Sequence, residues 1–286
     1  MPSSPFRFGT VGTPRSRPKK PGGSMGTITH LASQNLHALE LGWVRSVRIS
    51  EKTCAAIKQT AQEHDVSLSI HAPYYINLNA DEDGWFKSRK WLMDAARLGH
   101  LAGATDIVFH PGSYFKQEPA RVLDTALPRL RDCAAELEAA DIPVRLRPET
   151  MGKRALLGSL EDTLVMASEI AIVEPCLDFA HLHARRGDGS LNTTEEWSEV
   201  LSRYREALGK ESLERLHCHL SGIQYSEKGE QHHLLLDDSD FDLNALLQAL
   251  KMFSCGGRIL CESPQVMDIE ALKIKTAWTF LQGEQA

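Results

Sequence analysis

The chain has 286 residues, of which 42% are hydrophobic and 24% charged, and its formal net charge is −6. This composition is typical of a folded globular protein and argues against disordered and fibrous proteins. No apolar run approaches the ~20 residues of a membrane span, so we expect no membrane partner. The first residues lack the charged start and apolar stretch of a secretory signal, which predicts a cytoplasmic protein.

Short strand-like runs alternate with amphipathic helical runs along the chain, which is the pattern of an α/β fold with a parallel sheet. The expected strands are 6–11, 38–42, 67–71, 106–110, 144–147, 175–178, 215–219 and 258–262. Eight strand–helix units favour a closed (β/α)8 TIM barrel, and a doubly wound open sheet with extra strands is the second interpretation. No repeat or long linker divides the sequence, so residues 1–286 are assigned to a single domain.

The segment 14–23 follows the first expected strand and is rich in proline, glycine and basic residues. Its cationic residues are Arg15, Arg17, Lys19 and Lys20. Such a composition rarely packs, so a solvated, mobile loop is the first interpretation. A loop that contacts phosphate groups is the second.

Two helices have a recognisable start. Ser159 and Thr193 are each followed three residues later by an acid, Asp162 and Glu196, which is the arrangement of a capping box. Apolar residues then recur at a spacing of three to four positions, as expected for one buried helical face.

Six of the expected strands end in, or run directly into, a residue that can bind a metal ion. These residues are His71, His110, Glu149, Asp178, His219 and Glu262. In a closed parallel barrel the C-terminal ends of all strands open on one face, so we expect these side chains to converge. His181 lies one helical turn beyond Asp178. The loop after the seventh strand adds Glu230, His232 and His233, and we favour His232 over its neighbour as a ligand.

Each of these residues also has an ordinary structural interpretation. His110 can be a packed turn residue, Glu149 a surface ion pair, and Asp178 or Glu262 a helix N-cap. Independent structural roles would not place imidazoles and carboxylates at the same ends of successive strands, so we favour a metal site. The histidines to which we assign no role are His30, His37, His64, His100, His183 and His217.

A ligand set of nitrogen and oxygen atoms without thiolate suits Zn, Mn or Fe. Nine ligands exceed the needs of one ion, and with bridging carboxylates they could hold three divalent ions. The charges, about +6 from the ions, about −4 from the acids and about −1 from a hydroxide, leave about +1. This balance favours an anionic phosphodiester over a neutral sugar, and it weakens the objection that an acidic protein binds nucleic acid poorly.

Seven segments together resemble the endonuclease IV family of abasic-site endonucleases. They lie within residues 66 to 264 and are His71-Ala-Pro-Tyr74-Tyr-Ile-Asn77-Leu, Val108-Phe-His110-Pro-Gly112-Ser113, Pro148-Glu149-Thr150, Leu177-Asp178-Phe-Ala-His181, His219-Leu-Ser-Gly, Glu230-Gln-His232-His233 and Leu260-Cys-Glu262-Ser-Pro264. The resemblance implies a TIM barrel with three zinc ions per chain, although Mn2+ is also compatible with the ligands. It assigns the first ion to His71, His110 and Glu149. It assigns the second to Glu149, Asp178, His219 and Glu262, and the third to His181, Glu230 and His232.

The same resemblance implies a hydrolase that cleaves double-stranded DNA 5′ to abasic sites in base excision repair. Glu149 and Glu262 would be catalytic and orient the attacking water, while Tyr74 would contact DNA. We expect a monomer.

The chain departs from the family pattern in three places. Glu230 stands where the family usually has Asp, and Ser221-Gly222 replaces Asn-Asp. The first two loops after strands match poorly, and there Arg45 and Arg48 are candidate substitutes for DNA contact. Hydrolytic chemistry is therefore better supported than lesion specificity. Two alternatives stay open, a metal-dependent sugar isomerase or epimerase on the same barrel and a barrel that binds DNA lesions without turnover.

Overall fold

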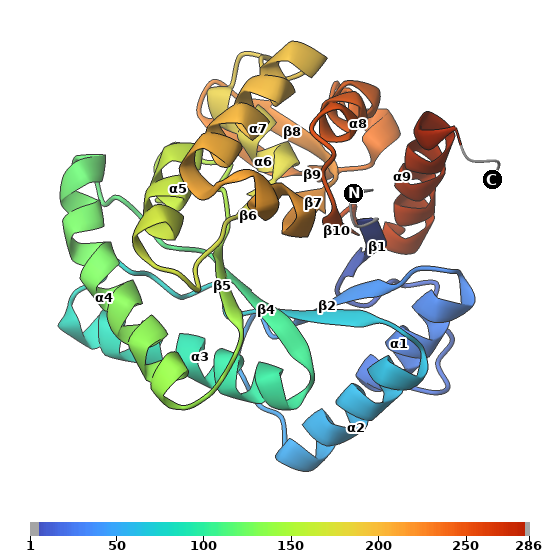
Figure 1. Ribbon diagram of the computed structural model, residues 1–286, viewed down its shortest axis with the longest axis horizontal. Helices are drawn as coiled ribbons and strands as arrows, with labels where there is room; N and C mark the ends of the chain where they lie inside the picture. Colours follow the sequence, from blue (N-terminus) through green and yellow to red (C-terminus); the bar gives the residue numbers. More distant parts are fainter. Residues whose placement is uncertain (1–5, 284–286) are drawn as a thin grey trace.

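The structure is a computed structural model that describes residues 6–283. Residues 1–5, on which the expectation of no export signal rests, lie outside the described residues. Eight parallel strands surround a central axis and helices cover their outer side (Figure 1). The barrel strands are β1 Phe6–Val11, β2 Ala38–Gly42, β3 Ser67–His71, β4 Ala104–Phe109, β5 Arg145–Pro148, β6 Cys176–Asp178, β7 Leu216–Leu220 and β10 Gly257–Cys261. The helices are α1 Gly23–Ser33, α2 Glu51–Glu63, α3 Glu82–Leu101, α4 Pro119–Ala139, α5 Leu160–Glu169, α6 Phe179–Arg186, α7 Thr194–Leu208, α8 Leu243–Met252 and α9 Met267–Gln282.

The strands pair in the order β5-β4-β3-β2-β1-β10-β7-β6. The two end strands also approach each other, because Glu149 forms a parallel bridge with Cys176 and the amide of Thr150 donates to the Cys176 carbonyl at 3.0 Å. The sheet is therefore a nearly closed barrel. The predicted (β/α)8 TIM barrel is confirmed, and the open doubly wound sheet is wrong.

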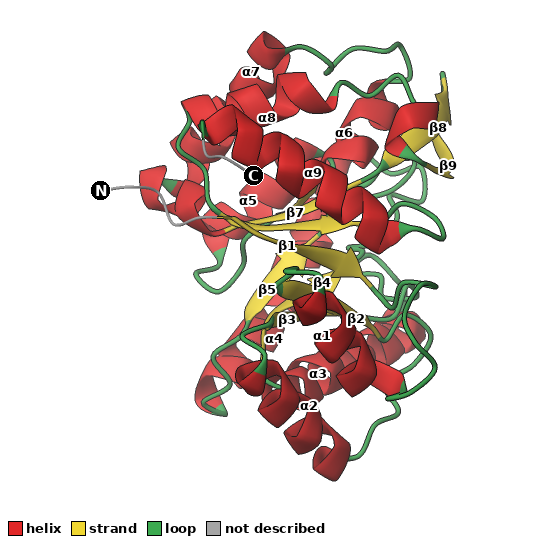
Figure 2. Ribbon diagram, turned by 90° about the vertical axis from the view of Figure 1, so that its right-hand side faces the viewer, coloured by secondary structure: helices red, strands yellow, loops and turns green. Residues whose placement is uncertain are grey.

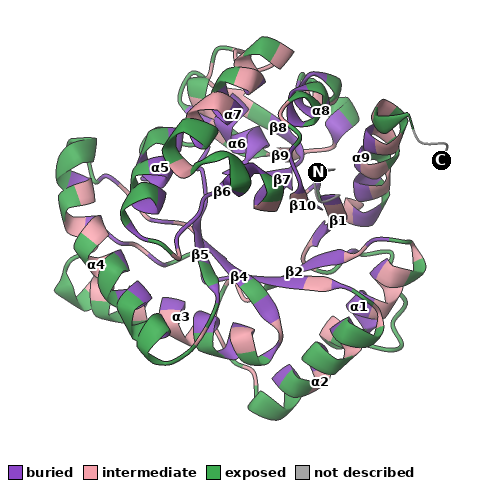
Figure 3. Cartoon of the chain, in the orientation of Figure 1, coloured by how far each residue is buried: buried purple, intermediate pink, exposed green. Residues whose placement is uncertain are grey.

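The helices begin and bury their faces as their sequences predict. Ser159 and Thr193 each form a capping box, with Asp162 and Glu196 respectively. Figure 3 shows buried residues along the strands and the inward sides of the helices, and exposed residues on the outer sides. No helix in the part of the chain from 6 to 283 is long and apolar enough to cross a membrane.

The apolar core lies between the strands and the helices, whereas the inside of the barrel is polar. Phe6 of β1, for example, packs edge-on against Trp278 of α9, with ring centroids 5.1 Å apart. Inside the barrel, the buried Arg147 donates to Asp106 at 2.6 Å, and Arg258 pairs with the same carboxylate at 2.9 Å. Arg147 also pairs with Glu174 at 3.1 Å, so the two cations meet two carboxylates, which is the condition for keeping such charges away from water.

One element was not expected from the sequence. The segment after β7 forms an antiparallel hairpin of β8 Gly222–Ser226 and β9 Gly229–Leu234, which projects beyond the barrel strands (Figure 2). Its position is held by the loop after β5, because the amide of Glu230 donates to the Gly152 carbonyl at 3.1 Å and Gly229 bridges to Lys153. The hairpin thus forms one wall of the barrel mouth.

The basic segment 14–23 contacts the rest of the fold through Ser16, whose hydroxyl lies 3.2 Å from Nε2 of His30 and donates to Asp268. One of its cations bonds within the segment itself. Arg17 donates to the carbonyls of Pro18 and Pro21, each at 2.8 Å. Arg15, Lys19 and Lys20 are exposed. Contact of these side chains with phosphate stays a prediction.

Candidate metal centre

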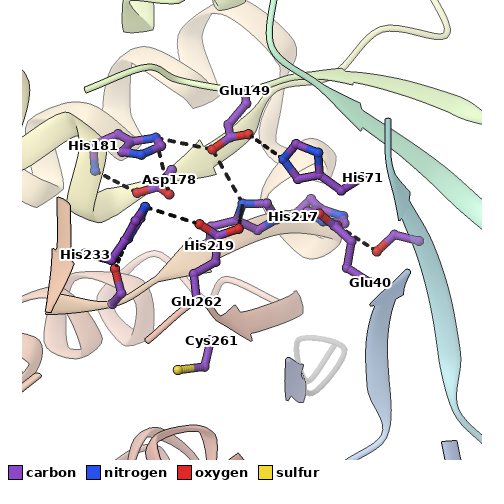
Figure 4. Close-up of polar contacts among 12 residues, drawn as sticks. Glu40, His71, Glu149, Asp178, His181, His217, His219, His233, Cys261 and Glu262 are labelled. Carbon is purple, nitrogen blue, oxygen red and sulfur yellow. Dashed lines mark hydrogen bonds and ion pairs between the residues drawn. The ribbon is translucent and has the colours of Figure 1, made fainter. Parts of the chain in front are cut away.

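Eight of the nine expected ligands meet at the C-terminal mouth of the barrel, and His233 joins them in place of His232. Three groups have donor atoms that lie within 4.8 Å of one another. The groups are His71, His110 and Glu149; Glu149, Asp178, His219 and Glu262; and His181, Glu230 and His233. Figure 4 shows most of these side chains pointing toward one another. All of them except Asp178 and His219 border a cavity of about 300 Å³.

Glu149 lies at the centre of the cluster and connects the groups. One carboxylate oxygen, Oε2, is 3.3 Å from Nε2 of His71 and 3.2 Å from Nε2 of His110. The other, Oε1, is 3.2 Å from Nδ1 of His181 and 3.6 Å from Nδ1 of His219. Each oxygen therefore faces a different part of the cluster, as a carboxylate that bridges two ions would.

Asp178 combines the two roles that its sequence position allows. It is the N-cap of α6, since its Oδ1 accepts a hydrogen bond from the amide of His181 at 2.7 Å. Its second oxygen, Oδ2, is buried without a hydrogen-bond partner among the described residues and lies 3.3 Å from Nδ1 of His181. The N-cap interpretation and the metal interpretation are thus compatible, because they use different oxygen atoms.

His181 is held so that one nitrogen faces the hairpin. Its Nδ1 bonds to the Thr150 carbonyl at 2.9 Å, which leaves Nε2 facing Oε2 of Glu230 at 3.6 Å. A carbonyl can only accept, so Nδ1 is the donor and Nε2 is free to act as a ligand.

The hairpin corrects the preference for His232. In β9 the pairs are Gln224–His232 and Tyr225–Glu230, so Gln231 has no partner and forms a bulge. A bulge shifts the alternation of side chains by one residue, so Glu230 and His233 face the same side. His233 lies 3.6 Å from Glu262, whereas His232 is exposed and belongs to none of the candidate groups among residues 6–283.

Tyr74 covers the edge of the cluster. It is 51% exposed, and its ring stacks on that of His110 with centroids 5.1 Å apart and an interplanar angle of 26°. Partial burial and the nearby carboxylates of Glu262 and Glu149 raise the pKa of Tyr74 to about 12, so its hydroxyl stays protonated at neutral pH.

The structure places Arg45 and Arg48 beside the metal cavity and not in it. Both are exposed and line a hollow of about 270 Å³ with Trp43. The loop that carries them is joined to the rim, because the amide of Tyr74 donates to the Val44 carbonyl at 3.0 Å. Their contact with DNA stays a prediction.

The carboxylates and imidazoles shift one another's proton affinity. Burial disfavours the charged form of His71, but its hydrogen bond to Glu149 and the carboxylate's charge outweigh this effect and raise its pKa to about 9. Burial alone would raise the pKa of Glu149, yet His110 and the other imidazoles hold that pKa well below its usual range. A divalent cation and protons therefore compete for the same nitrogen atoms.

Buried polar atoms without hydrogen-bond partners are a second indication of a metal centre. Nδ1 of His219 and Oδ2 of Asp178 are buried and lack hydrogen-bond partners among the described residues, although both face the cluster. Unsatisfied buried polar atoms are costly, so they indicate that another group completes the site. Nitrogen and oxygen donors in groups that share Glu149 suit zinc or a similar divalent ion.

Sequence reasoning missed two residues beneath the cluster, Glu40 and His217. No role was assigned to His217, but it is fully buried inside the barrel, and its Nε2 is 2.8 Å from Oε2 of Glu40. The signals were present: Glu40 is an acid within the apolar strand 38–42, and residues two apart on a strand, such as His217 and His219, face the same side.

A parallel barrel with clustered metal-binding side chains at its C-terminal mouth defines a broad class of metal-dependent enzymes. Residues 28–281 match the family described as xylose isomerase-like TIM barrel, and the chain belongs to this family. It is 35% identical over 260 residues to an uncharacterized protein of Methanocaldococcus jannaschii, and the match covers 91% of this chain and 92% of the relative.

Other similarities point to two groups of proteins. Endonuclease 4 of Thermus thermophilus is 30% identical over 167 residues, but the match spans only 58% of each chain. Among solved structures, an endonuclease IV from Thermus thermophilus has a TM-score of 0.72 at 24% identity, covering 96% of this chain and 99% of that one. A D-tagatose 3-epimerase-like protein has a TM-score of 0.71 at 17% identity, covering 97% and 96%. These structural similarities show the fold alone.

Proposed function

We propose that the protein is a zinc-dependent phosphodiesterase that cleaves DNA 5′ to abasic sites. The observation that carries the proposal is the set of three donor groups linked by the carboxylate of Glu149. A site for one ion needs three or four ligands, so nine are in excess unless several ions are bound. The partial match to an endonuclease 4 supports the same activity.

Each of the three donor groups would hold one ion. The first would be held by His71, His110 and Glu149; the second by Glu149, Asp178, His219 and Glu262; and the third by His181, Glu230 and His233. When bound, zinc lowers the pKa of a water molecule to about 7 and stabilises negative charge on phosphate oxygens. Mn2+ is the alternative ion, since imidazole and carboxylate ligands also suit it.

Glu149 and Glu262 would orient the attacking water. Both border the cavity, but Glu149 is buried between the first two groups. Glu262 is partly exposed between the second and third groups, 3.5 Å from His219 and 3.6 Å from His233. The more accessible carboxylate is the better hydrogen-bond acceptor for a water beside the substrate. We therefore assign water positioning chiefly to Glu262 and the bridging role to Glu149.

The cavity accounts for selection of a damaged site. Its volume of about 300 Å³ can hold a sugar-phosphate unit but leaves no room for a stacked base pair. The reacting nucleotide must swing out of the duplex, which costs least where pairing is already lost. On the rim, the exposed Lys153 would pair with the phosphate and Tyr74 would pack on the sugar, while Arg45 and Arg48 would contact the neighbouring duplex.

The proposal is tested with a labelled duplex that carries one tetrahydrofuran abasic analogue. We expect a single nick 5′ to the analogue, abolished by a chelator and restored by zinc, with about three zinc ions per chain. An undamaged duplex of the same sequence is the control. Retardation of the abasic duplex without a nick would indicate a lesion-binding protein instead.

A sugar epimerase or isomerase is the second candidate. Two carboxylates, Glu149 and Glu262, border one small cavity, and such a pair can transfer protons on a bound sugar. Such enzymes typically use one or two ions. Conversion of a ketohexose by a protein that holds one or two Mn or Mg ions, together with no DNA cleavage, would favour this function.

A further inference from the structure

A buried carboxylate lies directly beneath the candidate metal centre. Glu40 of β2 reaches across the inside of the barrel to β7, where its Oε1 is 3.1 Å from Nε2 of His219 (Figure 4). Its Oε2 accepts hydrogen bonds from Ser69 at 2.8 Å and lies 2.8 Å from Nε2 of His217. All four side chains are fully buried. Glu40 belongs to none of the donor groups that border the cavity.

His219 is the residue that connects Glu40 to the metal centre. Its Nδ1 faces Glu262 at 3.5 Å and Glu149 at 3.6 Å, while its Nε2 faces Glu40. Only one nitrogen of a neutral imidazole carries the proton, and a ligand nitrogen must not carry it. A carboxylate beside Nε2 keeps the proton there and leaves the lone pair of Nδ1 for the ion.

We infer that Glu40 is a positioning residue that orients His219 and keeps its Nδ1 available for a metal ion, with Ser69 and His217 holding the carboxylate in place. The inference rests on the metal centre of the proposed function, but it is independent of the substrate.

A fourth ion among these side chains is a less suitable explanation. Cys176, His217 and His219 do have donor atoms within 4.8 Å of one another. However, Nε2 of His217 is hydrogen-bonded to Glu40 at 2.8 Å, and Nε2 of His219 lies in ion-pair contact with the same carboxylate at 3.1 Å. Two ligands of one tetrahedral zinc at ~2.0–2.1 Å would lie about 3.3 Å apart.

The test is Glu40→Gln, which changes one carboxylate oxygen into a donor group while keeping the size of the side chain. The amide can keep its bonds to Ser69 and His217 only by turning its NH2 group toward Nε2 of His219. That arrangement moves the imidazole proton to Nδ1, the nitrogen that faces the ions. Zinc affinity of the purified full chain is measured by competition with a chelator, and the number of bound ions by mass spectrometry.

We expect Glu40→Gln to bind zinc about 10–100-fold more weakly than the wild type. The matched control is Glu174→Gln, because Glu174 is also a buried carboxylate but pairs with Arg147 at 3.1 Å and Arg215 at 2.7 Å, away from the metal centre. This control should lose thermal stability but keep the wild-type zinc affinity. Unchanged zinc affinity in a folded Glu40→Gln protein would overturn the inference.

Two further variants keep the test decisive. If Glu40→Gln does not fold, Ser69→Ala tests the inference in its place, because it removes only one hydrogen bond to Glu40. Several-fold weaker zinc binding by this variant would support the inference, and unchanged zinc binding would overturn it. If the wild type binds a fourth ion that Cys176→Ser loses, Glu40 is part of a separate site and the inference is wrong. None of these measurements uses DNA, so failure of the proposed substrate leaves their outcome unaffected.

Discussion

The ring of Tyr74 lies almost parallel to the imidazole of His110, with centroids 5.1 Å apart, and meets the ring of His71 edge-on at 5.2 Å. The tyrosine therefore shields two of the candidate ligands from solvent while half of its own surface stays exposed. An aromatic ring in this position can contact a substrate and the metal centre at the same time.

Tyr74→Ala is expected to weaken binding of abasic DNA by about 1–3 kcal/mol, the range for loss of one aromatic stacking contact, which corresponds to about 5–150-fold. Tyr74→Phe keeps the ring and should bind nearly as the wild type does. Binding is measured with a non-cleavable abasic duplex. Equal losses in both variants would show that the hydroxyl, and not the ring, makes the contact.

Glu262→Gln should lower kcat for nicking by about 100-fold or more, since the amide cannot accept the proton or orient the water as a carboxylate does. Folding should be unaffected, because Glu262 borders a cavity and carries no buried ion pair with Arg or Lys among the described residues. Glu227→Gln, at an exposed position of the hairpin formed by β8 and β9, is the control. If Glu262→Gln nicks DNA at the wild-type rate, its assigned role is wrong.

The two neighbouring histidines of β9 provide a direct test of the hairpin geometry. His233→Ala removes a donor of the third group and should reduce the bound zinc from about three ions to about two, the number that the other two groups would hold. His232→Ala changes an exposed side chain and should leave the ion count unchanged. Metal content is measured by mass spectrometry after dialysis. The reverse result would mean that the register of β9 is different.

The stability of the metal-free protein should depend on pH in a defined direction. The carboxylates outweigh burial and raise the pKa of His71 to about 9 and that of His181 to about 10. An unfolded histidine titrates near 6.5, so these groups stabilise the fold fully below ~pH 6.5, and the contribution is lost as the pH rises through 9 and 10. Thermal unfolding in a chelator should therefore show a falling Tm between pH 7 and pH 10.

Zinc binding should depend on pH in the opposite direction, because fewer protons compete with zinc for the imidazole nitrogens at higher pH. Zinc affinity, measured by chelator competition over the same pH range, should increase as the pH rises. A Tm of the metal-free protein that rises with pH would contradict the assignment of protonated His71 and His181.

Much of the fold and of the site followed from local patterns. The alternation of strands and helices predicted the barrel, and the residues at the strand ends, such as His71 and Glu149, were expected at its mouth. This inference is reliable because parallel strands in a closed barrel direct all their C-terminal ends to one face, whatever the details of the loops. The capping boxes at Ser159 and Thr193 could also be predicted from the sequence, because they depend on residues only three positions apart.

Other features depended on contacts that no local pattern contains. His233 faces the cluster because Gln231 is bulged out of the pairing of β9, and a bulge depends on how two strands meet. Glu40 supports His219 only because β2 and β7 lie across one barrel, although 179 positions separate the two residues in sequence (219 − 40). The sequence by itself therefore determined which residue types stand at the barrel mouth, and the tertiary structure decided which of their atoms face one another.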